Sequence, residues 1–419
     1  MRGGPYVQLT ENEFAILNGS EGKARQFAME ILVKMGESCG AKRLIPIDSV
    51  HLVLHAYKSA FTAGVEAAER IAEMGGKFTV PTTIDPCGMD AEDWRAARTP
   101  EHYAKMQLRL NDAVMKMGVI PVWTCTPYYG FNLPRFGSHI GWSESSAVSF
   151  ANTVLGARTN RQSAIIDICM GIIGKAPEIG LHLDENRRGQ VLIELNIDRP
   201  LKQWEYPALG FLLGKKLGSK IGVVNGMKGS PPQDSLKAMC AAAAASGSVA
   251  LMHIVGITPE ARTLEDAFRG NTPEENIVIT EESLKDIRSK MTQHEGAELD
   301  FVALGCPHYS INEMIRVRDL LNGRKVHKNI TMWIFANSYA IKLAEQMGLR
   351  KELEDAGITI RAETCMIISP LSEWGFKTIM TDSGKCTHYA PMECKTDIVF
   401  SSTKDCVESA IAGHIVKED

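Results

Sequence analysis

The segment LDFVALGCPHYSINEMI, residues 299–315, carries the pattern that identifies the fold class. Its apolar run, residues 299–304, is typical of a buried strand, and a helix is predicted to begin near Ser310. The same order of strand, loop and helix recurs towards the C-terminus. Further strands are predicted at 330–335, 358–362, 377–380 and 397–400, with helices beginning near Ser338 and Thr403. This alternation predicts parallel βαβ units, and therefore an α/β fold with parallel sheets.

Three cysteines follow predicted strands of this pattern. Cys306 lies in LGCPHYS, Cys365 in AETCMI and Cys386 in TDSGKC, each in a predicted loop after a strand. Such loops gather at the carboxyl edge of an open sheet, so the three thiols are expected to converge. Three thiolates suit zinc or an iron-sulfur cluster, and a cluster held by only three cysteines keeps one position free for substrate. The alternative is three unrelated core cysteines, because their spacings of 59 and 21 residues match no short metal motif.

The other seven cysteines carry weaker signals. Four lie on apolar, helix-like stretches where a small buried residue is the usual explanation: Cys39, Cys169, Cys240 and Cys406. Three lie in predicted loops and are reserve ligands or pocket residues: Cys87, Cys125 and Cys394.

The N-terminal part is predicted to be mainly helical. Amphipathic helices are expected at 21–35 and 61–74, and Thr10 with Glu13 predicts a capping box that opens an earlier helix. Strands are predicted at 77–80 and 119–123, followed by the loop CTPYYGFNLPRFGSHIGW and a helix from about Ser143. A loop of that length in a compact domain is usually functional. An approximate division places this helical and α/β part at 1–214 and the βα repeats at 215–419.

Composition excludes several classes of function. The 419 residues are 44% hydrophobic and 23% charged, and the net charge is −4 with no basic stripe. Nucleic acid and anionic membrane are therefore not expected partners, whereas a small molecule is. The uncharged segment 240–257 is rich in alanine and broken by Ser-Gly-Ser, so we expect a buried helix followed by a strand at 249–255. Ten cysteines and an N-terminus without an apolar signal core favour a cytoplasmic location.

Long ordered motifs also give a family resemblance. Besides LGCPHYS, AETC and TDSGKCTHYAP, the chain contains PTTIDPCGMD, CTPYY, ESSAVSFANTVLGART and GSVALMHIVGITPEA. With these motifs it resembles the large catalytic subunit of the aconitase X family along nearly its whole length. The resemblance implies an aconitase-like core of three α/β domains around an iron-sulfur centre. It also implies a heterodimer, in which a separate small subunit supplies the swivelling domain and a catalytic serine that this chain lacks.

The resemblance assigns Cys306, Cys365 and Cys386 as the metal ligands. It leaves open whether they hold a 4Fe-4S, 3Fe-4S or 2Fe-2S cluster or a mononuclear iron. The implied reaction is a dehydration, with cis-3-hydroxy-L-proline and 5-phosphomevalonate as candidate substrates. A different reading is a metal-binding structural or regulatory subunit whose partner carries the chemistry. A zinc hydrolase is disfavoured, because no HExxH ligand pair is present.

Loss of hydroxide next to a carbon acid requires positioned charge. Candidate cations are Lys385 beside Cys386, Arg158 in LGART and Lys58 in HAYKS. His308, two residues after Cys306, is expected to orient the leaving hydroxyl or to support the cluster, and His388 is a weaker candidate.

Substrate contacts are predicted from spacing and from hydroxyl groups. Glu144 and Asn152 are eight residues apart near a helix start, so both are expected to face one pocket. Thr82, Thr83 and Ser383 supply hydroxyls suited to carboxylate or phosphate oxygens.

Overall fold

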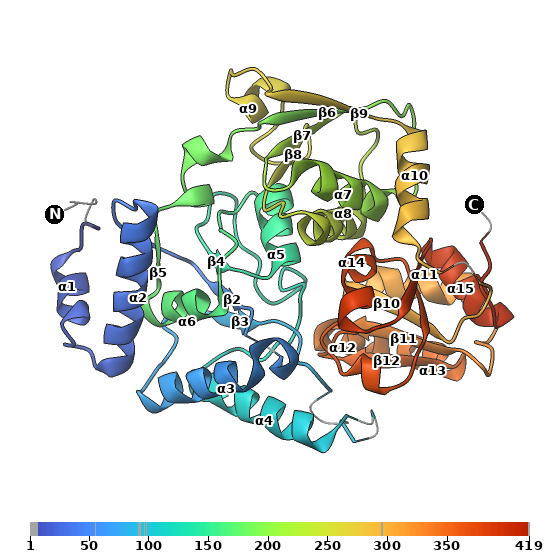
Figure 1. Cartoon of the computed structure of the whole chain (residues 1–419), viewed down its shortest axis with the longest axis horizontal. Helices are drawn as coiled ribbons and strands as arrows, with labels where there is room; N and C mark the ends of the chain where they lie inside the picture. The colour runs from blue at the N-terminus through green and yellow to red at the C-terminus, as the bar shows by residue number, and fades with distance from the viewer. Residues whose placement is uncertain are drawn as a thin grey trace.

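The computed structural model describes residues 7–54, 56–90, 94–95, 97, 99–294 and 296–417. Three α/β regions lie side by side around a common centre (Figure 1). The N-terminal region occupies the left and lower part of that view, the middle region the top, and the C-terminal region the right. The fold class is therefore α/β with parallel sheets, as the strand and helix alternation predicts.

The N-terminal region contains two small sheets and six helices among its described residues. β2 (Val50–Leu52) lies between β3 (Thr82–Ile84) and β4 (Gly141–Trp142) in a parallel sheet. β1 (Leu44–Pro46) pairs antiparallel with β5 (Lys175–Pro177). The helices are α1 (Glu11–Leu17), α2 (Lys23–Cys39), α3 (Tyr57–Glu73), α4 (Glu101–Lys116), α5 (Ser145–Phe150) and α6 (Ala164–Ile173). A π-helical turn, Ala151–Leu155, continues α5, and two short 3-10 helices follow at Gly180–His182 and Asp184–Arg187. The predicted capping box of Thr10 and Glu13 opens α1.

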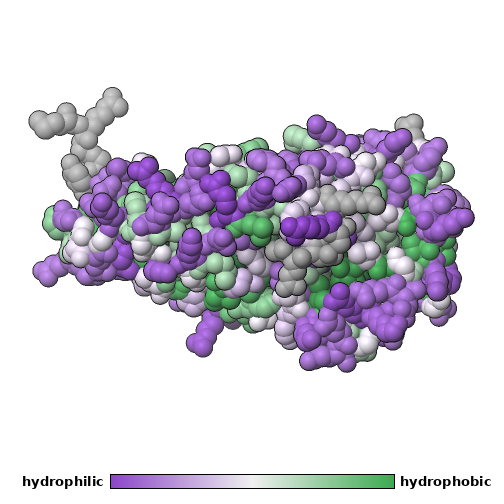
Figure 2. All heavy atoms as spheres, turned by 90° about the horizontal axis from the view of Figure 1, so that it is seen from below, coloured by the Kyte–Doolittle hydropathy of each residue, from purple (hydrophilic) through white to green (hydrophobic). Residues whose placement is uncertain are grey.

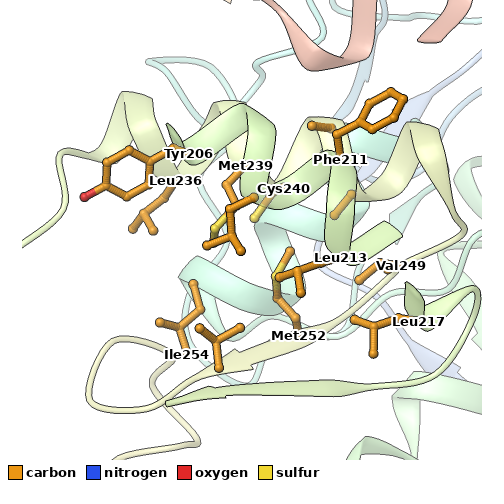
Figure 3. Packing of buried hydrophobic residues seen from close by; sticks show 14 of the residues in the cluster. Tyr206, Phe211, Leu213, Leu217, Leu236, Met239, Cys240, Val249, Met252 and Ile254 are labelled. Atoms are coloured by element: carbon orange, nitrogen blue, oxygen red, sulfur yellow. The ribbon is translucent and has the colours of Figure 1, made fainter. Parts of the chain in front are cut away.

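The middle region is a four-stranded parallel sheet in the order β8-β7-β6-β9. Its elements are β6 (Val191–Leu195), α7 (Glu205–Leu217), β7 (Gly222–Asn225), α8 (Gln233–Ser246), β8 (Met252–Ile254), α9 (Leu264–Phe268), β9 (Glu275–Ile279) and α10 (Glu281–Met291). Figure 3 shows the core between α7, α8 and β8, where Leu213, Met239, Cys240 and Met252 meet. The predicted buried helix and strand within 240–257 are confirmed as the end of α8 and β8, and Cys240 packs in the core. Because β6 lies before residue 215 and α7 contains it, this region extends across the approximate division expected from the sequence.

The C-terminal region is a five-stranded parallel sheet in the order β12-β11-β10-β13-β14. Its elements are β10 (Phe301–Tyr309), α11 (Ile311–Leu321), β11 (Thr331–Ala336), α12 (Ser338–Gln346), α13 (Leu349–Asp355), β12 (Ile358–Ala362), β13 (Thr378–Thr381), α14 (Gly384–Glu393), β14 (Asp397–Phe400) and α15 (Thr403–Ala412). A short 3-10 turn, Leu371–Glu373, precedes β13. The chain builds outward from β10 through β11 to β12, and then restarts at β13 on the other side. The carboxyl ends of β10 and β13 therefore border the topological switch point, where ligands bind in open α/β sheets.

Two predicted strands and one predicted buried cysteine are wrong. Residues 77–80 form no strand, because Phe78 and Thr79 bond to Met117 and Gly171 and the ladder beside β2 begins only after Pro81. Residues 119–123 make a single bridge, from Ile120 to Thr83, because Pro121 cannot donate to a ladder. Cys39 is exposed at the end of α2 instead of packing in a core.

The surface gives no sign of a membrane-spanning helix. Among the described residues, no helix combines the length and apolar composition needed to cross a bilayer. Seen from below, the molecule is mostly hydrophilic, and hydrophobic side chains gather on the right-hand part, which carries the C-terminal region (Figure 2).

Candidate active site

The three cysteines predicted to be ligands come together at the carboxyl edge of the C-terminal sheet. Cys306 lies near the end of β10, Cys365 follows β12, and Cys386 is in the first turn of α14. The prediction that all three lie in loops is therefore wrong for Cys306 and Cys386, although all three lie beyond the regular ladders. Their side chains are buried in one cluster with apolar residues of the same region.

The position of Cys306 depends on the glycine before it. Gly305 has a φ of +99°, and a Cβ there would lie 2.1 Å from the carbonyl oxygen of Phe335 in β11. Only glycine allows both this backbone conformation and this close approach. The ladder between β10 and β11 is correspondingly irregular between Leu304 and Tyr309, which turns Cys306 away from the regular strand pattern.

The thiols influence each other's ionisation. Cys306 and Cys365 are within hydrogen-bonding reach, and this contact lowers the pKa of Cys365 while it raises the pKa of Cys306. The backbone N–H of Ile367 and the charge of Lys385 also favour the Cys365 thiolate. Burial raises the pKa of Cys386. Cys365 is therefore the first of the three to become a thiolate, which is the form that binds metal.

The donor set suits a soft metal centre. Two further buried thiols, Cys125 and Cys394, lie close enough to Cys365 for its charge to raise the pKa of both. However, in the part of the chain that the structure describes, no group of three His, Cys, Asp or Glu side chains is arranged to hold a single metal ion. Three thiolates of this kind are typical ligands of zinc or of an iron-sulfur cluster.

A buried ion pair lies beside the cysteines. Lys385, in the first turn of α14, donates to Glu144 Oε1 at 2.5 Å and to Ser146 Oγ at 2.7 Å. Burial opposes the charge on both partners, but their attraction raises the pKa of Lys385 well above its usual value and lowers the pKa of Glu144 to about 2. Glu144 also caps α5 by accepting from the Ala147 N–H. The N-terminus of α5 stabilises the Glu144 carboxylate, and this carboxylate in turn holds the Lys385 ammonium beside the cysteines.

His308 is neutral and fully bonded. Its Nδ1 lies 3.1 Å from Thr124 Oγ1, its Nε2 lies 2.7 Å from the Thr364 carbonyl, and its backbone N–H donates to Cys125 Sγ. Burial lowers the pKa of His308 to about 4. It therefore ties the loop after β12, which carries Cys365, to the end of β10 that carries Cys306.

Two more predicted residues also hold the cysteine segments in place. Ser383 caps α14: its hydroxyl donates to the Cys306 carbonyl and accepts from the Cys386 N–H at 2.9 Å. Lys58 donates to the carbonyls of Ile367 at 2.6 Å and Glu393 at 2.8 Å, on either side of the cysteines. Both therefore contact segments next to the ligands.

Four predicted substrate contacts are bonded elsewhere. Arg158 pairs with Asp184 and the His182 carbonyl. The Asn152 amide donates to three carbonyls and accepts from Arg187 and the Thr159 N–H. Glu144 bonds to Lys385 and Ser146, so it and Asn152 have different partners, and the expectation that both face one pocket stays a prediction.

The two threonines are bonded inside the N-terminal region. The Thr82 hydroxyl donates to the Val80 carbonyl at 3.0 Å. The Thr83 hydroxyl contacts His51 Nδ1 at 2.9 Å and accepts from Asn132 at 3.1 Å. Of the less favoured candidates, His388 is half-buried on α14 and packs against the rings of Phe211 and Tyr389.

Sequence reasoning missed a buried pair in the N-terminal sheet. His51 Nε2 lies 3.0 Å from Asp85 Oδ1, and burial lowers the pKa of His51 to about 4 although Glu144 acts in the opposite direction. Asp85 directly follows β3, so the strand-end signal that identified the cysteines also applied to it. His51 lies within β2 and carries no such signal.

Tyr128 is a second missed candidate. Its hydroxyl is buried without a hydrogen-bond partner among the described residues, and its ring stacks on Phe150 at 3.9 Å. Burial raises the pKa of Tyr128 well above its usual value, and Cys125 and Glu144 contribute. The long loop noted in the sequence contains it.

A cavity of about 150 Å³ reaches Cys306 from the junction of the middle and C-terminal regions. Its lining includes Asp234, Lys237, Glu313 and Asp382. Lys237 is 1% exposed, donates to the His308 carbonyl at 3.0 Å and pairs with Glu313. The buried Lys237–Glu313 pair therefore contacts the backbone of β10 two residues after Cys306.

Family models match three consecutive parts of the chain. Residues 6–185, 189–289 and 299–412 match the family models described as aconitase X first, second and third domain. The chain is 40% identical to the phosphomevalonate dehydratase large subunit of Methanocaldococcus jannaschii, over 96% of this chain and 100% of that protein. It is 36% identical to the cis-3-hydroxy-L-proline dehydratase of Pseudomonas aeruginosa, over 96% of this chain and 69% of that enzyme.

A solved structure has the same fold. The holo-form of Thermococcus kodakaraensis aconitase X superposes with a TM-score of 0.88 at 36% identity, covering 96% of this chain and 100% of that chain.

Proposed function

This chain belongs to the aconitase X family and is a hydro-lyase, and we propose that it is the large subunit of a two-subunit enzyme that removes water from a small hydroxylated carboxylic acid. The observation that carries the proposal is the convergence of Cys306, Cys365 and Cys386 beside the Lys385–Glu144 pair. A soft metal site next to a fixed cation matches the needs of a dehydration.

The proposed cofactor is an iron-sulfur cluster held by these three cysteines. Buried, mutually interacting thiols are the ligands that such a cluster requires. When bound, a cluster with an open iron supplies a Lewis acid for the hydroxyl and carboxylate of the substrate.

The chain's own residues then supply charge and position. Lys385 places a positive charge where negative charge develops on the substrate as its carbon loses a proton. Glu144 keeps Lys385 protonated and oriented. His308, neutral and bonded through both ring nitrogens, is assigned a positioning role for the Cys306 and Cys365 segments instead of proton transfer. Ser383 holds Cys306 and Cys386 in the same way.

The partner is a small subunit, because several relatives are named large subunits. In this proposal the small subunit covers the site and contributes the serine base, so the isolated chain is inactive. The two substrates to test are 5-phosphomevalonate and cis-3-hydroxy-L-proline, after the names of the relatives.

The test is anaerobic co-expression with the organism's small subunit, followed by dehydration assays on both substrates. We expect turnover of one substrate by the complex, none by the isolated chain, and bound iron and sulfide in both. A complex that contains iron and turns over neither substrate would leave the alternative of a structural metal-binding subunit.

Single replacements test the ligands. Cys306→Ser, Cys365→Ser and Cys386→Ser should each lose most of the iron and sulfide together with activity, because three-thiolate coordination fails when one ligand is removed. Cys240→Ser is the matched control, since Cys240 packs in the core of the middle region and should keep normal iron content. Iron and sulfide analysis of the four purified variants makes the comparison, and retention of iron by all three ligand variants would refute the assignment.

A further inference from the structure

We propose that the small subunit docks on a surface formed by α3 and α14, which we define by Phe61, Tyr389 and Met392 and call the α3–α14 face. The inference rests on the proposed two-subunit function and adds where on this chain the partner binds. Phe61 and Met392 are exposed, and Tyr389 and Met392 lie on the same helix as Lys385.

One face of α14 leads from the site to the surface. Lys385, Tyr389 and Met392 are spaced at i, i+4 and i+7, so they share that face of the helix. Lys385 lies inside the site, Tyr389 is half-buried, and Met392 is 72% exposed. A partner that packs on Tyr389 is therefore about one helical turn from Lys385, and one that packs on Met392 is about two turns from it.

The N-terminal region completes this face at its outer end. Lys58 in the first turn of α3 donates to the carbonyls of Ile367 and Glu393, which attaches α3 to the Cys365 loop and to the end of α14. Phe61 follows three residues later and is 67% exposed. Met392 directly precedes Glu393, so the exposed Phe61 and Met392 belong to the two segments that Lys58 joins.

The backbone of Phe61 indicates that its exposure is imposed by the fold. Its φ of 52° and ψ of −173° lie in a region that is essentially restricted to glycine, and they kink α3. Such strain persists where the surrounding structure enforces it, and it clusters at functional sites. Here it accompanies an exposed phenyl ring three residues after Lys58, which bonds to the segment that follows Cys365.

The occupant follows from the relatives. Several are named large subunits, and this chain spans only 69% of the single-chain Pseudomonas enzyme, which therefore contains additional polypeptide. A subunit that contributes a base must approach Lys385 and the cysteines. Exposed methionine and aromatic side chains are suited to the apolar centre of such an interface.

The test measures binding of the purified small subunit to the purified, iron-loaded chain by calorimetry. Met392→Glu and Phe61→Glu should each weaken the Kd at least tenfold, because each places a charge in the apolar centre of the interface. The matched controls are Met347→Glu and Phe14→Glu, which alter side chains of the same types that are 50% and 59% exposed elsewhere. Both controls should bind as the wild type does.

Phe61→Gly separates docking from folding. Glycine accepts the strained backbone, so this variant should unfold at a higher urea concentration than the wild type while it also loses at least tenfold in binding. All variants should keep wild-type iron content, since none of the four altered side chains is an assigned ligand.

Each outcome decides the inference. Wild-type binding by both charged variants, or equal weakening by the controls, would overturn it. So would a change in the chain's own oligomeric state without any change in small-subunit binding, since a second copy would then be the occupant. Failure of the wild-type chain to bind the small subunit would instead refute the proposed two-subunit function.

Discussion

At the residue scale, Lys385 and Glu144 keep each other ionised out of water. Lys385 is in the first turn of α14 and Glu144 is the N-cap of α5, so the two residues are 241 positions apart in the sequence. Both lie close to the cysteines of the site. Desolvation disfavours each charge, so each depends on the other. Removal of one partner leaves an uncompensated buried charge, which costs far more than the loss of an exposed pair.

We therefore expect Lys385→Met to impair both activity and stability. The assembled enzyme should lose on the order of 10²–10³-fold in kcat, the usual effect of removing one preorganised charge-stabilising group. The free energy of unfolding should fall by about 3 kcal/mol, because Glu144 stays buried without its cation. Ser146→Ala is the control, since it removes a neutral hydroxyl that accepts from Lys385 at 2.7 Å and donates to Glu144 at 3.0 Å, and it should cost about 1 kcal/mol. A Lys385→Met enzyme with full iron content and wild-type kcat would contradict the assigned role.

His51 predicts a pH dependence of stability. Burial lowers the pKa of His51 to about 4, so between the unfolded value of 6.5 and about 4 the unfolded chain binds a proton that the native chain does not. The contribution of His51 to the free energy of unfolding is therefore complete above pH 6.5. It is lost as the pH falls, by about 1.4 kcal/mol per pH unit. His182, whose pKa burial lowers to about 3, adds a slope of the same sign.

Urea unfolding at pH 7 and pH 5 measures this slope. His51→Gln should keep a hydrogen bond to Thr83. The change of its free energy of unfolding with pH should be smaller than in the wild type by about 1.4 kcal/mol per pH unit, because glutamine does not titrate. The exposed His414→Gln is the control. An unchanged slope in His51→Gln would show that His51 is not the group responsible.

At the element scale, the end of β10 depends on Gly305. Gly305→Ala combines a φ of +99° with a Cβ 2.1 Å from the Phe335 carbonyl, so β10 and β11 must separate. We expect a loss of more than about 2 kcal/mol in the free energy of unfolding, together with reduced iron content as Cys306 shifts. Gly323→Ala has a similar φ of +75° with open space around the added Cβ, and should cost only about 1 kcal/mol. Equal losses in the two variants would show that the contact with β11 is unimportant.

The elements of the C-terminal region could be predicted from the sequence, and their terminal turns could not. Strand and helix alternate with clear periodicity there. Because the carboxyl ends of parallel strands share one edge of the sheet, the sequence alone predicts that Cys306, Cys365 and Cys386 converge. The partners of Asn152 include the Ala250 carbonyl and Arg187, which lie far along the chain and which no local pattern indicates. The strand predicted at 77–80 failed because the hydrogen bonds of that segment go to distant residues, which no local pattern encodes.

The pairing of charges was equally inaccessible to local reasoning. Lys385 and Glu144 were each predicted as site residues, but nothing in either motif indicates that they meet. The motif of Arg158 suggested a substrate contact, but in the structure Arg158 pairs with Asp184. Tertiary structure decides which of several plausible cations faces the site.

At the scale of the whole molecule, one buried hub joins the three regions behind the site. Lys237 of the middle region bonds to Glu313 and to the His308 carbonyl of the C-terminal region. Asp234 accepts from Tyr129 of the N-terminal region at 2.8 Å and from Ser310 at 2.9 Å. These charged contacts therefore help to fix the relative positions of the regions, together with the Lys385–Glu144 pair and the contacts of Lys58 and His308.

Lys237→Met should therefore destabilise the whole chain. Methionine leaves Glu313 and Asp234 without their cation, so we expect a loss of about 3–5 kcal/mol in the free energy of unfolding. Lys228→Met, which removes an exposed pair with Asp198, is the control and should change stability by less than about 1 kcal/mol.

The pH dependence of that loss identifies the mechanism. Burial raises the pKa of Glu313 to about 7 even though Lys237 opposes the shift, so removal of Lys237 raises it further. A carboxyl whose folded pKa is raised stabilises the native state at low pH and loses that contribution as the pH rises through the folded value. Near pH 6 the Glu313 of the variant is protonated and neutral, whereas near pH 8 ionisation opposes folding. The deficit of Lys237→Met relative to the wild type should therefore be larger at pH 8 than at pH 6 in urea unfolding, and a deficit independent of pH would indicate lost packing instead of an unpaired charge.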